Sequence, residues 1–256
     1  MFTSDKFEEL YSKYNKRKYV SPDPLQFLYD YDDLECRTIV ALIASGLAYG
    51  RVKQILKSTS VILKELQPDP ATFLLNSNLE ELNVIFEDFK HRFTNGSEMA
   101  LFLFSIKEVI KQYGSLKAAF FAGYSKSDED ILPALKKFAE KITVLFPEGK
   151  SYLFPNPANG SASKRPILFL RWMIRSDEVD PGGWNEIPSS KLIIPLDTHM
   201  YQFAVKSGFT KRKSADIKTA VEITECFKKI NPDDPVKYDF ALTRFGIRDD
   251  LSPSEI

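Results

Sequence analysis

Hydrophobic residues recur at helical spacing along most of the chain. Segment 33–50 is strongly apolar and rich in small residues, which predicts a buried helix that ends near Gly46 or Gly50. Segment 51–67 repeats the pattern, with apolar residues three or four positions apart. Further amphipathic stretches predict helices over 79–93, 97–114, 127–146, 164–175, 197–208, 214–230 and 234–247. We find no alternating strand pattern, so the sequence predicts an all-α fold.

Two long loops interrupt the helical pattern in the second half of the chain. Segment 147–163 holds prolines, glycines and small polar residues, and segment 176–191 contains two adjacent glycines. Loops of this length in a compact protein are more often functional than idle. The residues that border them are therefore the first candidates for a functional site.

The composition excludes several classes of protein. With 256 residues, 43% of them hydrophobic, the chain can bury a sizeable core, and no apolar run is long enough to span a membrane. The N-terminus is charged and lacks the apolar centre of a signal peptide. Cys36 and Cys226 are too few for a four-cysteine zinc or iron–sulfur site. We therefore expect a cytoplasmic protein, nucleoid-associated if bacterial, that needs no metal or other cofactor.

Positive charge gathers in two segments although the chain as a whole is neutral. Lysine plus arginine balances aspartate plus glutamate at 35 each, which is mild evidence against a nucleic-acid binder. Yet 160–175 carries four basic residues and no acidic one, and 206–218 carries five basic residues against Asp216 alone. Either a local anionic partner or two solvent-facing helices would explain this pattern.

Asp197 lies between the apolar run "LIIPL" and a helix that begins at Thr198. Aspartate is a preferred N-cap residue, because its carboxylate accepts hydrogen bonds from the first backbone N–H groups of a helix. A carboxylate delivered from a buried run can also present its second oxygen to a substrate and stabilise developing positive charge. Taken alone, Asp197 is an ordinary cap; a catalytic role needs a second residue.

Lys164 is the candidate for that second residue. It follows the small-residue turn "NGSAS" and opens an apolar helix. A lysine is disfavoured at a helix N-terminus, where the helix dipole is positive, and a neutral lysine amine is a nucleophile toward a carbonyl or sugar carbon. A plain surface lysine is the alternative. Arg171 and Arg175 lie near one face of the same helix and would suit phosphate.

In this order, the segments resemble the helix-hairpin-helix DNA glycosylase superfamily. The resemblance is carried by the turn "NGSAS", by "KRPILFLRWMIR" with its leading lysine, and by "LIIPLDTH" before the next helix. From about residue 22 onward the chain is similar to an uncharacterised bacterial branch of that superfamily, with "YGRVKQI" as a further shared stretch.

The resemblance implies a two-lobed helical fold with a helix-hairpin-helix element and a cleft between the lobes. One lobe would cover about 25–175, with the hairpin at 150–175, and the other about 1–24 together with 190–256. The activity implied is that of a DNA glycosylase with abasic-site lyase activity, acting as a monomer on double-stranded DNA with a damaged base or an abasic site. An oxidised purine is the favoured base.

The resemblance also implies a role for each site residue. Lys164 would form a Schiff base with the sugar, and Asp197 would stabilise the positive charge that develops as the base leaves. Trp184 in the second loop is the candidate for a base pocket. The expected DNA contacts are Gly160, Ser161, Ala162 and Ser163 in the turn, with Arg171, Arg175, Tyr49, Arg51 and His199.

Two other functions remain open from the sequence. A DNA-binding protein of the same fold without catalysis would use the same basic segments. A helical protein that does not bind DNA would use Asp197 only as a cap, and it would show no salt-sensitive affinity for DNA.

Overall fold

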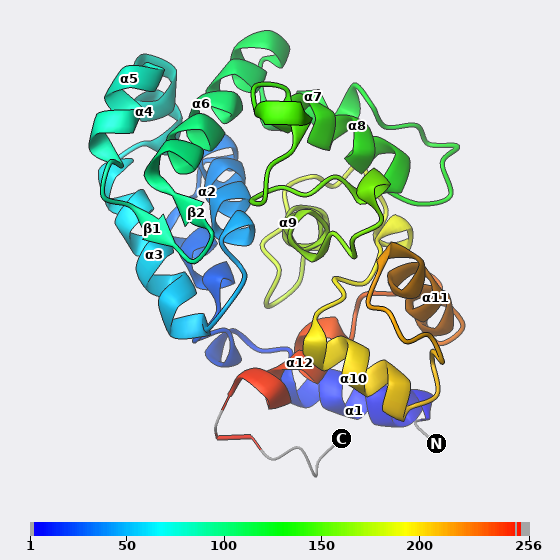
Figure 1. The fold of residues 1–256 in the computed structure, drawn as a ribbon. Coiled ribbons are helices and arrows are strands. Elements are labelled where there is room, and N and C mark those ends of the chain that lie inside the picture. The colour runs from blue at the N-terminus through cyan, green and yellow to red at the C-terminus, as the bar shows by residue number, and fades with distance from the viewer. Residues whose placement is uncertain (1–2, 249, 252–256) are drawn as a thin grey trace. The chain divides into compact units, whose positions relative to one another are not determined.

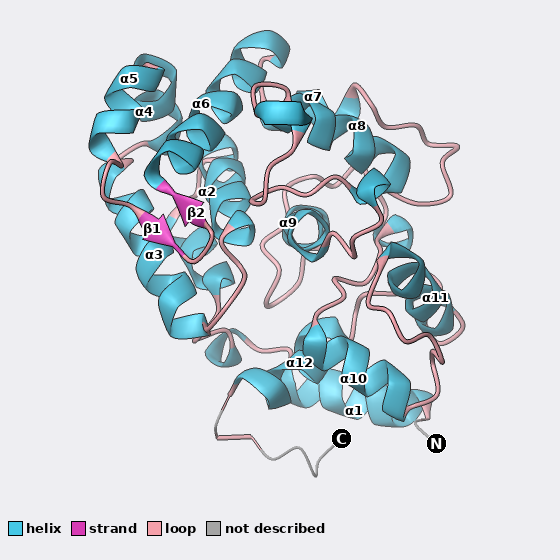
Figure 2. Ribbon diagram, in the orientation of Figure 1, coloured by secondary structure: helices cyan, strands magenta, loops and turns pink. Residues whose placement is uncertain are grey.

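The protein is described here from a computed structural model that covers residues 3–248, 250 and 251 (Figure 1). Helices make up almost all of the regular structure of these residues. Two short antiparallel strands form a hairpin, which is the one sheet found among them (Figure 2). The predicted all-α class is therefore confirmed. None of the helices found in these residues has the length and apolar character to cross a membrane.

The chain divides into two compact units. The first unit comprises the N-terminal stretch to Pro22, the short segment Glu129–Ile131 and the stretch from Pro157 onward. The second unit comprises Asp23–Asp128 and Leu132–Asn156. Each unit has its own buried apolar interior.

The second unit is built around α2 and α6, whose apolar faces are buried. Every residue of α2 from Ile39 to Ala44 is fully buried, and α6 packs against α5, α7 and α8. Its elements are η2 (Pro24–Asp30), α2 (Leu34–Gly46), α3 (Val52–Glu65), α4 (Pro70–Asn76), α5 (Leu79–Ile85), β1 (Lys90–His91), β2 (Thr94–Asn95), α6 (Gly96–Tyr113), α7 (Leu116–Phe121), α8 (Leu132–Thr143) and η3 (Pro147–Gly149).

The first unit gathers α1, α10 and α12, which lie together in Figure 1 and pack on one another. The Phe7 ring is fully buried among aromatic rings from several elements, including Phe203, Phe227 and Tyr238. Its elements are α1 (Ser4–Tyr14), η1 (Arg17–Tyr19), η4 (Pro157–Asn159), α9 (Lys164–Ile174), η5 (Ser189–Lys191), α10 (Thr198–Lys206), α11 (Ile217–Lys228) and α12 (Asp239–Ile247).

One predicted helix is wrong in its second half. The stretch 79–93 forms α5 only as far as Ile85, and the chain then turns into the hairpin of β1 and β2. Asn95 starts α6 with a capping box to Glu98. Gly96 allows the close approach, because a Cβ there would lie 1.9 Å from the carbonyl oxygen of Phe86.

Candidate active site of Lys164 and Asp197

Lys164 and Asp197 each stand at the start of a helix, and the structure brings them together. Lys164 is the first residue of α9, and Asp197 is the N-cap of α10. The Nζ atom of Lys164 lies 3.9 Å from Oδ2 of Asp197, and the two side chains are 33% and 14% exposed. Solvent therefore reaches both side chains, although each of them is partly buried.

The two oxygens of Asp197 have different tasks. Oδ1 accepts the backbone N–H of Met200 at 2.8 Å, which confirms the predicted cap. Oδ2 is the oxygen near Lys164. The preceding run is buried, and the N–H of Ile194 donates to Oγ1 of Thr224 on α11 at 3.0 Å. Because both sides of Asp197 are anchored, its carboxylate cannot easily turn away from the amine.

The loop before α9 turns sharply at two residues with left-handed backbone. Gly160 has φ +80° and Ser163 has φ +46°. Ser163, the N-cap residue of α9, is buried, and its side chain forms no capping hydrogen bond with the backbone N–H groups of the first turn. Gly160 and Ser161 are exposed, and Ala162 is half-buried. The turn that we expect to bind phosphate thus exposes its backbone beside the N-terminus of α9, where the helix dipole is positive.

A bridge joins this loop to the second basic segment of the sequence. Ser161 pairs antiparallel with Asp216, and the N–H of Ile217 reaches the carbonyl oxygen of Gly160 at 3.5 Å. Arg212 is held by Asp216 and Thr219. The four lysines of this segment, Lys206, Lys211, Lys213 and Lys218, are exposed. The bridge therefore joins the second basic segment of the sequence to the loop that leads into α9.

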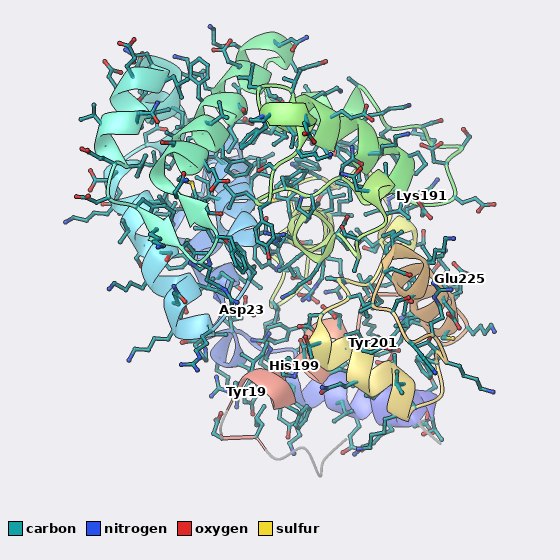
Figure 3. All side chains as sticks on the ribbon, viewed as in Figure 1. Tyr19, Asp23, Lys191, His199, Tyr201 and Glu225 are labelled. Carbon is teal, nitrogen blue, oxygen red and sulfur yellow. The ribbon has the colours of Figure 1, made fainter. Side chains whose placement is uncertain are left out.

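His199 packs against α12. A Cβ added to Gly246 would lie 2.1 Å from Nδ1 of His199, so the ring fits against the glycine backbone. The imidazole is half-buried on α10, from which Tyr201 also projects (Figure 3). Its contact with DNA stays a prediction, while its packing sets how α10 meets α12.

Gly246→Ala should destabilise the protein by about 1–3 kcal/mol, because the new methyl group overlaps the His199 ring. Chemical denaturation gives the free energy of unfolding. The double variant Gly246→Ala/His199→Ala should recover part of the loss, since the ring that blocks the methyl group is gone. Additive effects of the two changes would contradict this packing.

Arg171 and Arg175 do not face solvent, so the prediction that they bind DNA phosphate is wrong. Their exposed fractions are 2% and 3%. Arg171 donates to both carboxylate oxygens of Asp180, at 3.1 and 3.2 Å, and also to Asp239. Arg175 binds Asp234 at 2.9 Å and also Asp177 and Asp180. Helical spacing placed both arginines on one face, but that face lies inside.

The surrounding carboxylates keep these arginines charged. Burial alone would lower the pKa of Arg171, but the negative charges of Asp180 and Asp239 raise it above its ordinary value. The same holds for Arg175, with Asp180, Asp234 and Asp177 as its partners. We name this set the buried charge network: Arg171, Arg175, Asp177, Asp180, Asp234 and Asp239.

Asp239 gives this network a pH dependence. Burial raises its pKa to about 6; Arg171 opposes this from α9 and Arg244 from α12, while the charges of Asp197 and Asp180 reinforce it. The folded protein therefore holds a proton that the unfolded chain has released above about pH 4. Between about pH 4 and 6 this carboxyl lowers stability as pH rises, and its effect is constant above that range.

Compared with Asp239→Asn, the wild type should lose roughly 2 kcal/mol of stability between pH 4 and pH 7. The asparagine cannot ionise, so only the wild type pays for a buried negative charge as the proton leaves. Urea unfolding of both proteins across this range measures the difference. A difference that stays flat or grows in favour of the wild type would contradict the raised pKa.

Trp184 is not in a base pocket, and that prediction is also wrong. The side chain is fully buried and meets the Phe169 ring edge to face, with centroids 5.4 Å apart. The loop folds back on α9, where the N–H of Trp184 donates to the carbonyl oxygen of Met173 at 2.8 Å. A base could not stack on this ring without opening the interior.

Comparison with known families decides what the chain is related to. A family model described as "Protein of unknown function (DUF2400)" matches residues 23–248. The chain belongs to the DUF2400 family. Neither a curated protein nor a solved structure matches it.

Membership of DUF2400 corrects the resemblance to helix-hairpin-helix DNA glycosylases, which was wrong. That resemblance was carried by short stretches, and two of them have a simpler local reason: "PLDTH" supplies a cap to α10, and "NGSAS" supplies the left-handed turn before α9. The preference for an oxidised purine depended only on the resemblance and falls with it.

Tyr49 and Arg51 of this DUF2400 protein belong to the second unit, whereas Lys164 and Asp197 belong to the first. Tyr49 is half-buried, and its hydroxyl donates to the carbonyl oxygen of His91 at 2.8 Å. Arg51 is exposed just before α3. Their contact with DNA stays a prediction.

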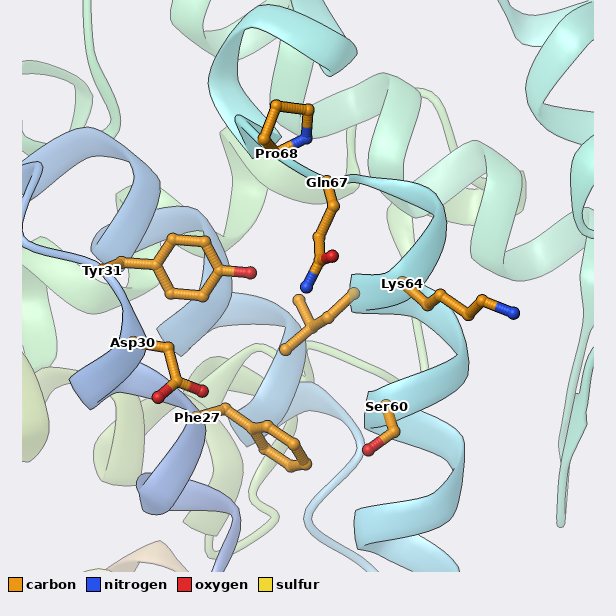
Figure 4. Close-up of a pocket in the computed structure, with 8 residues that line it drawn as sticks. Phe27, Asp30, Tyr31, Ser60, Lys64, Gln67 and Pro68 are labelled. Atoms are coloured by element: carbon orange, nitrogen blue, oxygen red, sulfur yellow. The ribbon is translucent and has the colours of Figure 1, made fainter.

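The second unit also contains a pocket of about 330 Å³ that sequence reasoning missed (Figure 4). It lies where the end of η2 meets the last turns of α3, so its residues are far apart in sequence and form no motif. It is lined by Phe27, Asp30, Tyr31, Ser60, Leu63, Lys64, Gln67 and Pro68. None of the predicted site residues contributes to it.

Proposed function

We propose that this DUF2400 protein cleaves DNA at abasic sites through a Schiff base on Lys164, with Asp197 as its catalytic carboxylate. The proposal includes release of a damaged base by the same pair. The observation that supports it most is the 3.9 Å approach of the Lys164 amine to a carboxylate whose other oxygen is fixed by a backbone N–H. An amine and a rigid acid, both reachable from solvent, are the groups that imine chemistry requires.

The reaction begins at the aldehyde carbon C1′ of the abasic sugar. The Lys164 amine, after giving a proton to Asp197 directly or through one water, adds to C1′ and forms a carbinolamine. Asp197 returns that proton to the carbinolamine hydroxyl, which leaves as water, and the now ionised Asp197 stabilises the positively charged imine. Asp197 then accepts a C2′ proton directly or through one water, the electron pair of that C–H bond forms the C2′=C3′ double bond, and the phosphate leaves with the electron pair of the C3′–O bond. Water hydrolyses the imine and returns the free lysine.

Base release would use the same two residues. The amine, after giving a proton to Asp197, attacks C1′ as the bond to the base breaks, and the departing base takes up that proton from Asp197. The sugar becomes positively charged in this step, and Asp197 is the nearest negative group to the attacking amine that the structure gives. The lysine nitrogen is then bonded to C1′ of the closed sugar ring; it passes a proton to O4′ as the C1′–O4′ bond breaks, which gives the same imine, so one site would serve both activities.

The surroundings of Lys164 support a polyanion as the substrate. The open N-terminus of α9 and the exposed turn at Gly160 and Ser161 can receive a phosphate. The bridge from Ser161 to Asp216 joins that turn to the segment that carries the exposed lysines Lys211, Lys213 and Lys218. These groups take the place of Arg171 and Arg175 as the proposed phosphate contacts. A DNA-binding cleft between two lobes, a cytoplasmic location and a monomeric state stay predictions.

A labelled duplex with one abasic site tests the proposal. With EDTA present to silence contaminating nucleases, the protein should nick this duplex at the abasic site and leave the matched intact duplex uncut. The product should carry the unsaturated sugar end of β-elimination. Binding of the duplex with no cleavage above the spontaneous rate would replace the proposal with DNA binding alone.

A further inference from the structure

Three separate segments of the second unit bring aromatic rings together at its surface. Phe93 and Tyr152 meet edge to face with centroids 5.5 Å apart, and Tyr49 meets Tyr152 in the same way at 4.9 Å. Phe93 is 67% exposed and Tyr152 is 47% exposed. We call Tyr49, Phe93 and Tyr152 the aromatic surface.

A buried, hydrogen-bonded histidine fixes the hairpin that carries Phe93. Phe93 stands at the tip of the β1–β2 hairpin, and His91 beneath it is fully buried. The His91 ring has Nδ1 at 2.9 Å from Oγ of Ser58 and Nε2 at 3.1 Å from the carbonyl oxygen of Tyr49. Because the support is buried and hydrogen-bonded, the exposure of Phe93 does not come from a loose loop.

Tyr152 is fixed in a similar way. Its neighbours Ser151 and Leu153 are both buried, and the Ser151 hydroxyl accepts the N–H of Leu153 at 3.2 Å. The carbonyl oxygen of Leu153 lies against Gly46 at the end of α2. The chain thus points Tyr152 outward between two anchored residues, and a rigid, exposed pair of aromatic rings results.

Positive charge surrounds these rings. Arg51, Lys53, Lys90 and Arg92 are exposed, and none of them forms an ion pair within the described part of the chain. The Arg92 guanidinium lies over the Phe93 ring, 5.5 Å from its centroid. Two exposed acidic residues, Glu87 and Asp88, precede β1, so the four exposed basic residues outnumber them.

We propose that the aromatic surface binds unpaired nucleobases of DNA, with Phe93 and Tyr152 stacking on bases and the surrounding cations contacting phosphates. Exposed aromatic rings among unpaired cations are the combination that holds single strands, because every base has a stacking face and every nucleotide a phosphate. An apolar protein partner would not need the four cations. The choice of DNA rests on the proposed function, but the surface uses neither Lys164 nor Asp197.

The test compares two strands that differ only in their bases. One is a fluorescent single-stranded 20-nucleotide DNA, and the other is a strand of equal length made of base-free sugar analogues. Fluorescence anisotropy at fixed salt gives both affinities. The wild type should prefer the strand with bases. Phe93→Ala should weaken binding to that strand roughly 5- to 100-fold and leave the base-free strand nearly unchanged.

Matched variants make the result specific. Tyr152→Ala should act like Phe93→Ala, whereas Phe93→Trp should keep the preference for bases. Val84→Ala removes an exposed apolar side chain from α5, 75% exposed, and should change nothing. The melting temperatures of Phe93→Ala and the wild type should lie within about 4 °C of each other, because the ring is mostly exposed and loses only the contacts with Tyr152 and Arg92.

Two outcomes would contradict the proposed stacking. In the first, the wild type binds both strands equally well or binds neither. In the second, the affinity of Phe93→Ala for the strand with bases lies within twofold of that of the wild type. These failures are separate from failure of the lyase. Lys164→Ala should keep the full preference for bases. Stacking without any cleavage of abasic DNA would sink the proposed activity and leave the aromatic surface standing.

Discussion

Lys164→Ala should abolish the covalent adduct that forms when borohydride is added to the protein with abasic-site DNA. It should also lower the rate of strand cleavage by about 1000-fold or more. The amine is the only atom of the proposed mechanism that bonds to the sugar, so no neighbouring group can take its place. Adduct formation is read on a denaturing gel, and cleavage from the labelled strand.

The fold should survive this change. The Lys164 side chain is one-third exposed, and its 3.9 Å approach to Asp197 is worth at most about 1 kcal/mol at such a site. Lys164→Arg keeps the charge but not the nucleophile and should be equally inactive. Lys136→Ala removes an exposed lysine of α8, outside the proposed site, and should still form the adduct.

Asp197→Asn separates the two tasks of the acid. Asparagine caps a helix about as well as aspartate, so the start of α10 should be preserved. The neutral amide cannot take the proton of the amine, so cleavage should slow by about 100-fold or more. Full activity of Lys164→Ala or of Asp197→Asn would show that the two side chains form a structural ion pair and take no part in catalysis.

Arg171→Ala should destabilise the protein by about 3–5 kcal/mol, the largest stability effect expected here. Arg171 is fully buried and bonded to Asp180 and Asp239, so its removal leaves two carboxylates in the interior without their main partner. It also unties α9, which carries Lys164, from α12. Urea unfolding followed by circular dichroism measures the loss.

The control for Arg171→Ala is a salt bridge in water. Lys6 pairs with Glu9 at 3.2 Å on the exposed side of α1. Lys6→Ala should cost less than about 1 kcal/mol, because solvent screens the pair. A loss for Arg171→Ala as small as that of the control would mean that the buried charge network contributes little.

Much of the fold could be predicted because local chemistry decides it. Apolar spacing predicted α2, α3 and α6, and the cap at Asp197 followed from one acidic side chain at the end of an apolar run. Lys164 was expected to open a helix because the turn "NGSAS" precedes it and an apolar stretch follows it, and it does.

The errors arise where tertiary contacts decide. Arg171 and Arg175 are basic in sequence, but their partners Asp234 and Asp239 come from a distant segment that folds over α9. Trp184 lies in a glycine-rich loop, yet that loop folds back and buries it. The run of acids at Asp177, Glu178 and Asp180 was the one signal in the sequence for an internal ion-pair network.

The family prediction failed for a related reason. The turn and the capping aspartate each satisfy a requirement of helix geometry that many helical proteins share, and the lysine adds only a single residue to them. The match that covers residues 23–248 carries more weight than such features. What remains is the pair of side chains, which the structure places 3.9 Å apart.

The most direct test of the proposed activity is to locate the borohydride-trapped sugar by mass spectrometry of proteolysed adduct. The account predicts the added mass on Lys164 alone, and no adduct in Lys164→Ala. An adduct on another lysine, or none at all with a protein that binds abasic DNA, would contradict a Schiff base at this site.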